Sequence, residues 1–381
     1  MQENQIVEES TPDKFYVKRR QDYIKYRSII LNGGENCIPC PFPRLSKAWA
    51  GIERKKTYLI TGNQKSGKSK FAMYLFVLHP LWYAYTHRYI KVKIIIFSLE
   101  MAKEQLYDMF TVWWLYKMTN GKINIDVDYL NSIRRDRPLD DSILELLVTP
   151  KFTEFFDFIE EHIDIDTVNR NPYGMYKKCK DYAEENGTTY YKPVIIKDEI
   201  TGQPKTMQIK DYYVPNTDEY RIVVYDHVSL ISVERGMTLR DSMKKMFSRD
   251  MMELRNVYGY TNVPLQQQNL QQEGIDNYKL AQLKPSATGL ETYKDSSKDV
   301  DMMIGIFDPF RHNLPSYEKY RIVDGLKNKQ RFIEIILNRT GTAGNMTALY
   351  FNGASNIFYE LPPATHPDMS MIYHKITNNE L

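Results

Sequence analysis

The stretch GNQKSGKSK at residues 62–70 has the residue types and spacing of a phosphate-binding loop, G-x-x-x-x-G-K-[ST]. Its glycines let the backbone wrap closely and point N–H groups at phosphate oxygens. Lys68 would reach the β- and γ-phosphates, and the Ser69 hydroxyl would bind Mg²⁺. The residues expected to hold ATP and its Mg²⁺ are Gly62, Asn63, Gln64, Lys65, Ser66, Gly67, Lys68 and Ser69. The loop predicts a nucleotide and leaves open what its energy is used for.

Two acidic residues stand at the ends of predicted strands. Glu100 follows IIIFSL, and Asp226 ends RIVVY. Ligands of open α/β sheets bind beside the carboxyl ends of the strands. There Glu100 would polarise the water that attacks the γ-phosphate, while Asp226 would hold Mg²⁺ opposite Ser69. The alternative for Glu100 is a solvated side chain that caps the next helix.

A run of three glutamines and an arginine end two further strands. Gln266, Gln267 and Gln268 follow NVPL. A glutamine there can sense the γ-phosphate; Gln267 is the candidate, although spacing does not decide among the three, and a polar strand end is the alternative. Arg339 follows RFIEIILN and opens a turn. It would act as an arginine finger on a neighbouring subunit, or else be an ordinary surface arginine.

Strand-like and helix-like segments alternate along the chain. The expected strands cover 57–61, 91–101, 220–231, 260–268, 299–307 and 331–339, with a closing hairpin in TALYFNG and IFYEL. The expected helices cover 70–78, 102–118, a long and mostly helical stretch to about 186, and 238–259. Buried strands separated by helices predict an α/β fold with a mostly parallel, wrapped sheet.

Changes in composition divide the chain into three parts. Residues 1–43 would contain a disordered start (1–12), a basic amphipathic helix (13–31) and a Gly/Pro-rich linker; residues 44–362 would form the ATPase domain; residues 363–381 would be a tail. Within the domain, residues 188–218 contain two strand-like runs around Thr201 and Gly202. They predict an inserted β-hairpin.

The bulk composition allows a core and does not fix a partner. The 381 residues are 42% hydrophobic and carry a net charge of +3, which permits nucleic acid without demanding it. No apolar run reaches 18 residues, so no membrane span is expected. Three cysteines are too few for a disulfide framework and indicate a reducing cytoplasm. Cys37 and Cys40 form a lone C-x-x-C, which we interpret as chance rather than zinc binding.

Several of these motifs, in this order, resemble the helicase domain of DnaB-type hexameric replicative helicases, which have a RecA-like P-loop NTPase core. The most specific piece is IIIFSLEMAKEQL. VVYDHVSLI, TNVPLQQQN, GLETYKDSSKDVDMMIGIF and IEIILNRTGTAGNMTALYFNGASNIFYEL are similar to later segments of that family. The likeness covers roughly residues 37–361.

The resemblance implies an ATP-driven helicase that forms a hexameric ring on single-stranded DNA in a bacterial or phage-infected cell. It makes Lys68, Glu100, Gln267 and Arg339 catalytic, with Glu100 as the base and Arg339 acting in trans. The helix at 13–31 would be the linker helix that docks on the next subunit. A loader, primase or polymerase would be a partner.

The resemblance also implies that two loops, 232–240 and 269–294, face DNA in the ring's channel. Their candidate DNA-binding residues are Arg235, Arg240, Lys279, Lys284 and Lys294. Such side chains would follow the phosphate backbone without reading sequence. For each of them the alternative is a solvated loop side chain.

The sequence departs from the family at several points. Leu337 stands where the family often has a lysine two residues before the finger. Either Lys327 or Lys329 substitutes for it, or the contact with the γ-phosphate in trans is weaker. His227 replaces a tyrosine, and the sequence predicts no helical collar domain before the linker. A phage-type helicase would fit. The alternatives are a RecA-fold DNA-dependent ATPase without unwinding activity, in repair or signalling, and a nucleotide-dependent ring scaffold.

Overall fold

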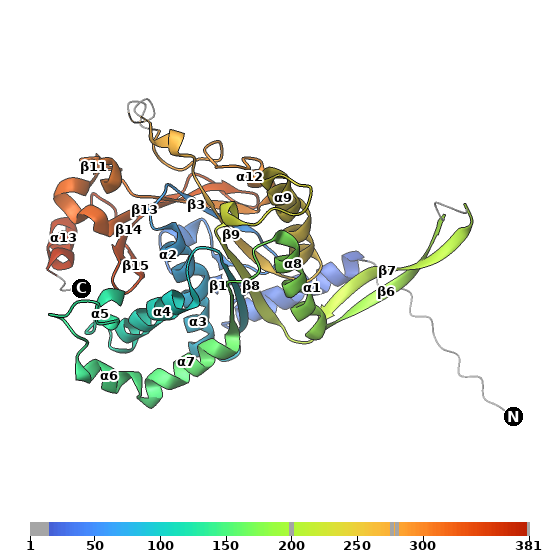
Figure 1. The fold of residues 1–381 in the computed structure, drawn as a ribbon, viewed down its shortest axis with the longest axis horizontal. Coiled ribbons are helices and arrows are strands. Elements are labelled where there is room, and N and C mark those ends of the chain that lie inside the picture. The colour runs from blue at the N-terminus through green and yellow to red at the C-terminus, as the bar shows by residue number, and fades with distance from the viewer. Residues whose placement is uncertain (1–14, 198–201, 275–277, 279–281, 379–381) are drawn as a thin grey trace.

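The computed structural model describes residues 15–197, 202–274, 278 and 282–378. A nine-stranded sheet runs through the molecule with helices on both faces (Figure 1). Its order is β15-β14-β13-β10-β3-β9-β8-β4-β5. The strands from β10 to β5 are parallel, and β13, β14 and β15 extend the sheet antiparallel. The sheet is mixed, and it is mostly parallel within an α/β fold, as predicted from the sequence.

The sheet strands have the following bounds: β3 Tyr58–Gly62, β4 Lys91–Ser98, β5 Ile163–Asp166, β8 Glu219–Asp226, β9 Thr261–Gln267, β10 Met302–Phe307, β13 Gln330–Asn338, β14 Met346–Asn352 and β15 Ile357–Glu360. Three two-stranded pairs lie outside it: β1 Ile38–Pro39 with β2 Gly51–Ile52, β6 Gly187–Lys197 with β7 Pro204–Pro215, and β11 Ser316–Tyr317 with β12 Tyr320–Arg321.

The helices have the following bounds: α1 Phe15–Leu31, α2 Lys68–Met73, α3 His79–Thr86, α4 Lys103–Met118, α5 Val127–Leu130, α6 Asp141–Leu147, α7 Pro150–His162, α8 Pro172–Glu185, α9 Leu239–Lys245, α10 Met252–Asn256, α12 Ser296–Asp299 and α13 Met369–Thr377. A π-helical segment joins α2 to α3, and another joins α9 to α10. None of the helices in the described part of the chain has the length and apolarity needed to cross a bilayer.

The central strands read as unbroken apolar runs because both of their faces are covered. On β4, Ile94 and Ile96 join the core that contains α2, α3, α4 and α7. Ile95 and Phe97 point to the other face and join the core beneath α8, α9 and α10. The period-two alternation of side chains along a strand therefore divides one apolar run between two cores.

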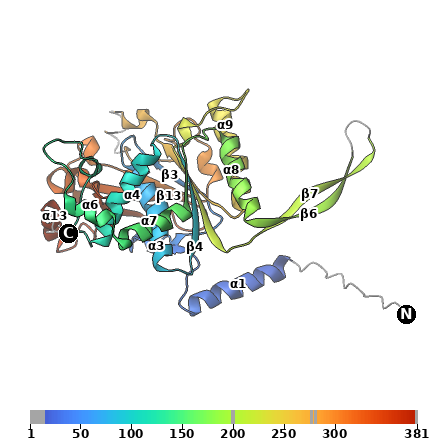
Figure 2. The same ribbon diagram turned by 60° about the horizontal axis from the view of Figure 1, so that its bottom comes forward.

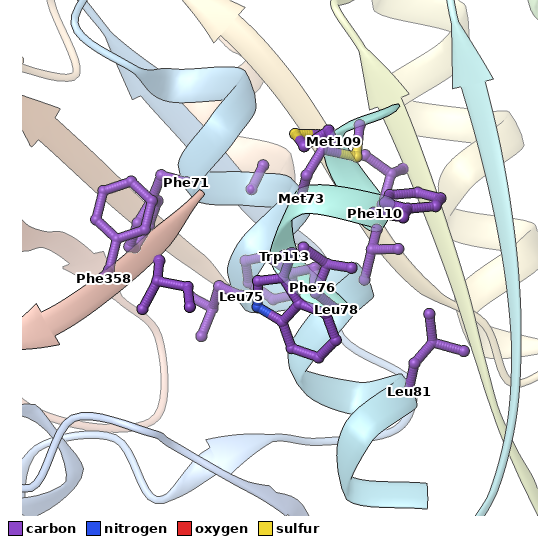
Figure 3. Packing of buried hydrophobic residues seen from close by; sticks show 14 of the residues in the cluster. Phe71, Met73, Leu75, Phe76, Leu78, Leu81, Met109, Phe110, Trp113 and Phe358 are labelled. Carbon is purple, nitrogen blue, oxygen red and sulfur yellow. The ribbon is translucent and has the colours of Figure 1, made fainter. Parts of the chain in front are cut away.

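The larger core lies between the sheet and the helix that follows residue 67. Phe71, Met73, Leu75, Phe76 and Leu78 pack there against Met109, Phe110 and Trp113 of α4 (Figure 3). Aromatic rings supply much of this contact; the Phe76 ring centroid lies 5.4 Å from that of Tyr58 on β3. This packing fixes the start of α2 against the sheet.

Strand register places the candidate site at the carboxyl ends of the central parallel strands. Gly62 is level with Gln267, and Ser98 is level with Asp226. These four residues end the parallel strands β3, β9, β4 and β8. Asn338 instead pairs with Met302, which is level with Tyr58 at the start of β3. The end of β13 therefore lies at the amino ends of the parallel strands. It is four residues, or roughly 13 Å along the strand direction, from the level of Gly62.

The inserted hairpin is confirmed as a long arm that projects from the body (Figures 1 and 2). At its base, the Tyr213 hydroxyl donates to the carbonyl oxygen of Ala183 at 2.7 Å. Farther out, Tyr190 and Tyr212 stack with their centroids 4.5 Å apart. Gly202 has the positive φ expected in its turn, and Thr201 lies outside the described residues.

Three sequence expectations need correction. The stretch before residue 186, expected to be mostly helical, also contains the edge strand β5. The expected tail contains α13, whose Tyr373 and Ile376 are buried against the end of the sheet. The helix at α1 exists, yet its apolar residues do not collect in one stripe, and α1 stands apart from the sheet and its covering helices (Figure 2). Residues 13 and 14, the expected start of this helix, lie outside the described residues.

Removing the Phe76 side chain should destabilise the fold strongly. Phe76 is 0% exposed, and a Phe76→Ala change leaves a cavity that the aromatic neighbours cannot fill. We expect the free energy of unfolding to fall by about 3–5 kcal/mol in urea denaturation. The matched control is Ile24→Ala on α1, where the side chain is 63% exposed. That change should stay within about 0.5 kcal/mol of the native value; equal losses in both variants would contradict this packing.

Candidate functional site

The phosphate loop joins β3 to α2 and depends on two glycines. A Cβ at Gly62 would lie 2.5 Å from the Ser66 Oγ and 2.8 Å from Ile306, so no larger residue fits there. Gly67 has a φ of +94° and precedes the first residue of α2. Left-handed backbone of this kind favours glycine. The loop therefore lies between a strand and the N-terminus of a helix, as anion binding requires.

Lys68, Ser69 and Asp226 meet at the end of this loop. The Ser69 hydroxyl donates to Asp226 Oδ1 at 2.9 Å. Asp226 is only 1% exposed, and this burial raises the pKa of its carboxyl to about 6 although the Lys68 charge opposes the shift. Burial lowers the pKa of Lys68 to about 8, against the attraction of Asp226 and Glu100. At neutral pH the two groups therefore carry opposite charges.

Glu100 and Gln267 both approach the Nε2 atom of His227. Glu100 Oε2 lies 3.8 Å from His227 Nε2, and the same nitrogen lies 3.1 Å from Gln267 Nε2. Burial lowers the pKa of His227 to about 4, so the ring is neutral and can accept a hydrogen bond from the Gln267 amide. The Glu100 side chain is 57% exposed. It therefore stands at the open rim of the site, beside the buried Asp226.

The three consecutive glutamines have different surroundings. Gln266 is buried and donates to the carbonyl oxygens of Glu291 and Tyr293. Gln268 is also buried and donates to Thr61 Oγ1 at 2.9 Å. Gln267 alone of the three contacts His227. The structure thus places the sequence candidate beside the acidic residues and gives its two neighbours structural hydrogen bonds.

Arg339 lies at the amino ends of the parallel strands, whereas the phosphate loop of its own chain lies at their carboxyl ends. Its guanidinium donates to the carbonyl oxygen of Lys298 at 2.8 Å and lies 3.8 Å from Asp301. The suggested lysine substitutes are wrong in position. Lys327 and Lys329 precede β13, whereas Arg339 follows it, so the full length of a nine-residue strand separates them. Leu337 remains the residue two positions before the arginine.

The candidate DNA-binding residues fall into two groups. Arg240, on α9, lies 3.9 Å from Asp295, so the loop containing Arg235 adjoins the loop containing Lys294. Arg235, Arg240 and Lys294 are exposed. Lys284 instead pairs with Glu334 of β13 at 3.0 Å, which compensates its charge. Lys279 lies outside the described residues.

Arg331 reaches the site although it was not among the sequence candidates. Arg331, on β13, donates from Nε to the carbonyl oxygen of Ser66 at 2.8 Å and pairs with Asp308 at 3.0 Å. A charged residue at the start of the run RFIEIIL, which is apolar apart from Glu334, was the available signal. A buried arginine in a central strand must have polar partners, but the sequence does not tell which.

The residues present fit a nucleoside triphosphate and its metal ion. Among the described residues, Asp226 Oδ2 and Ser66 Oγ are buried polar atoms without a hydrogen-bond partner. An unpaired buried acceptor is unfavourable, so both atoms are available to a ligand that enters the loop. Asp226 Oδ2 and the Ser69 hydroxyl offer the oxygen ligands that Mg²⁺ prefers. The loop backbone and Lys68 offer donors and positive charge to phosphates.

The central sheet, its covering helices and the phosphate loop form a RecA-like α/β P-loop fold. No family model and no curated protein matches the sequence. Among solved structures, one that is described as an ATPase domain matches with a TM-score of 0.63 and 15% identity, covering 92% of this chain and all of that one. A DnaB-like replicative helicase, solved to show its interactions with primase, matches with a TM-score of 0.61 and 16% identity over 92% of this chain and 68% of that one. The chain therefore has the fold of a DnaB-type helicase ATPase domain, as the sequence predicted.

The raised pKa of Asp226 predicts a pH-dependent stability in the nucleotide-free protein. Between its usual value near 4 and about 6, the folded protein binds more protons at this carboxyl than the unfolded chain, so stability falls as pH rises through this window. Asp226→Asn removes that titration. Relative to the native protein, the variant should gain roughly 2–3 kcal/mol between pH 4 and pH 6.5.

The measurement is urea denaturation at a series of pH values in the presence of a chelator. The control is Asp157→Asn, on the solvent-exposed face of α7, which should follow the native curve at every pH. A constant difference between native and Asp226→Asn protein across the window would contradict the buried-carboxylate assignment.

Proposed function

We propose that this protein is an ATP-dependent DNA helicase that assembles as a head-to-tail ring, moves along single-stranded DNA and separates the duplex at a replication fork. The observation that carries the proposal is that the phosphate loop lies at the carboxyl ends of the parallel strands and Arg339 at their amino ends. Each chain then supplies half of a catalytic site. A heterologous contact between these opposite ends on adjacent copies forms a ring when the rotation from one copy to the next closes.

Within one subunit, the proposed roles follow the geometry at the carboxyl edge. ATP would bind in the phosphate loop, where Lys68 attracts the β- and γ-phosphates. Ser69 and Asp226, joined by their 2.9 Å hydrogen bond, would hold Mg²⁺. Glu100 at the open rim would accept a proton from the attacking water. Gln267, paired with His227, would report the state of the γ-phosphate to the loop that follows β9.

The path for DNA is proposed along the loops that follow β8 and β9. Arg235, Arg240 and Lys294 are exposed and adjoin one another through the contact of Arg240 with Asp295. They would follow the phosphate backbone of one strand, and repetition around a ring would multiply their modest charge. Lys284 is a weaker candidate because Glu334 already compensates it. The fold of the matched helicase supports this choice over a nucleotide-dependent scaffold.

Glu100→Gln should separate nucleotide binding from hydrolysis. The amide keeps the shape of the side chain but cannot accept the proton, so we expect ATP turnover to fall about 10²–10⁴-fold while ATP binding persists. The assay is strand separation of a forked DNA duplex with ATP, run beside ATP turnover. Glu104→Gln, on the exposed first turn of α4, is the control and should behave as native.

Each outcome of that assay has a separate meaning. Separation by the native chain and not by Glu100→Gln supports the helicase and its base. DNA-stimulated turnover without strand separation, even with a loader protein added, would favour a RecA-fold ATPase that does not unwind. Near-native turnover in Glu100→Gln removes Glu100 as the base.

Mixing two inactive variants should restore ATP hydrolysis if Arg339 acts in trans. Arg339→Ala keeps its own phosphate loop and loses the finger; Lys68→Ala keeps the finger and loses phosphate binding. In randomly mixed rings at equal ratio, roughly one quarter of the interfaces combine the intact halves. We expect each variant alone to lose about 10³-fold or more in turnover and the mixture to recover part of it. No recovery in rings shown to be mixed would exclude the trans role.

A further inference from the structure

The guanidinium of Arg331 reaches from β13 to the backbone of the phosphate loop. Arg331 is 3% exposed, and its Nε donates to the carbonyl oxygen of Ser66 at 2.8 Å. Its Nη2 pairs with Asp308 Oδ2 at 3.0 Å, and Asp308 is itself 4% exposed at the end of β10. A buried ion pair between two neighbouring strands thus ends on a main-chain oxygen of the loop.

The remaining donors of this guanidinium are also engaged. Nη1 donates to the carbonyl oxygens of Asn328 at 2.7 Å and Gln330 at 2.8 Å, and Nη2 donates to Asn328 Oδ1 at 2.9 Å. Asp308 Oδ1 in turn accepts from the backbone N–H of Phe310 at 3.1 Å. Four hydrogen bonds and the ion pair with Asp308 therefore hold the planar fork, which leaves Arg331 little freedom to rotate or shift.

The contact with Ser66 fixes the direction of the next N–H group. In a planar trans peptide the C=O and N–H bonds point to opposite sides. Because Arg331 holds the Ser66 carbonyl, the N–H of Gly67 points away from Arg331. A Cβ at Gly67 would lie 3.6 Å from Arg331 Nε, so the guanidinium lies directly against this part of the loop. The phosphates of a bound nucleotide belong on the other side, where loop N–H groups converge.

We propose that Arg331 is a positioning residue that holds the Ser66–Gly67 peptide in the orientation that binds the β-phosphate. The inference rests on the proposed ATP site and adds a residue to it. Arg331 acts through the loop backbone and does not touch the nucleotide. Without it, the peptide can rotate, and a donor prepared for the phosphate is lost. The expected signature is a specific loss of phosphate-dependent affinity.

Two variants test this role. Arg331→Lys keeps a positive charge opposite Asp308, but a single ammonium cannot reproduce the fork that joins Asp308 to Ser66. Arg331→Met with Asp308→Leu removes both buried charges together, a replacement that often leaves folding stability nearly unchanged. We expect Mg·ADP to bind roughly tenfold to a hundredfold more weakly to both variants, and AMP to bind as tightly as to the native chain. The readout is the ratio of the two affinities by titration calorimetry.

Arg221→Met is the matched control for loss of a buried arginine. Arg221 is 2% exposed and pairs with Glu219 at 2.8 Å, but it lies at the start of β8, at the sheet edge away from the loop. It should lower the melting temperature as much as Arg331→Lys or more and leave the ADP-to-AMP affinity ratio at the native value. A role of Arg331 in stability alone would make the two arginine variants indistinguishable in that ratio.

Lys68→Ala in the same titrations separates this inference from the proposed function. If the native chain binds Mg·ADP no better than Lys68→Ala, the ATP site fails, and the role of Arg331 fails with it. If Lys68→Ala loses affinity while the folded Arg331 variants keep the native ADP-to-AMP ratio, only the role of Arg331 is overturned. A fallen ratio in the Arg331 variants, with Arg221→Met unchanged, supports the positioning role.

Discussion

A buried carboxylate is the constraint on which the site depends. Asp226 lies at the end of a central strand, out of contact with water, and burying an ionised carboxyl is unfavourable unless positive charge and donors surround it. Lys68 and Ser69, from the first turn of α2, supply both. The parallel order of β3, β9 and β8 brings these groups to the same edge. Burial still raises the pKa of Asp226, so Lys68 and Ser69 do not fully compensate its negative charge. A divalent cation bound there would supply the missing positive charge.

The sequence predicts the central strands well because burial on both faces makes them apolar and β-branched throughout, as in β4 and β8. It misses β5 because Ile163–Asp166 has only four residues, two of them aspartates, at an edge where one side has no partner strand. It overstates the amphipathic character of α1 because aromatic residues at many positions look like a stripe until they are placed around the helix.

The candidate site follows from the same logic. Residues at strand ends could be named in advance, since parallel strands bring their carboxyl ends together, and the motif supplied the loop. The choice among Gln266, Gln267 and Gln268 needed the structure, because alternation along a strand cannot tell which polar side chain meets His227. Arg331 was beyond sequence reasoning for a related reason: its partners, Ser66 and Asp308, come from distant segments.

Strand β13 carries one arginine at each end, Arg331 against the phosphate loop of its own chain and Arg339 at the far edge. In a head-to-tail ring this strand would run from one ATP to the next. A hydrogen-bonded strand in the middle of a sheet transmits displacement with little bending, since its neighbours hold it along its length. In the proposed ring, the two arginines of one rigid strand would therefore connect adjacent ATP sites directly.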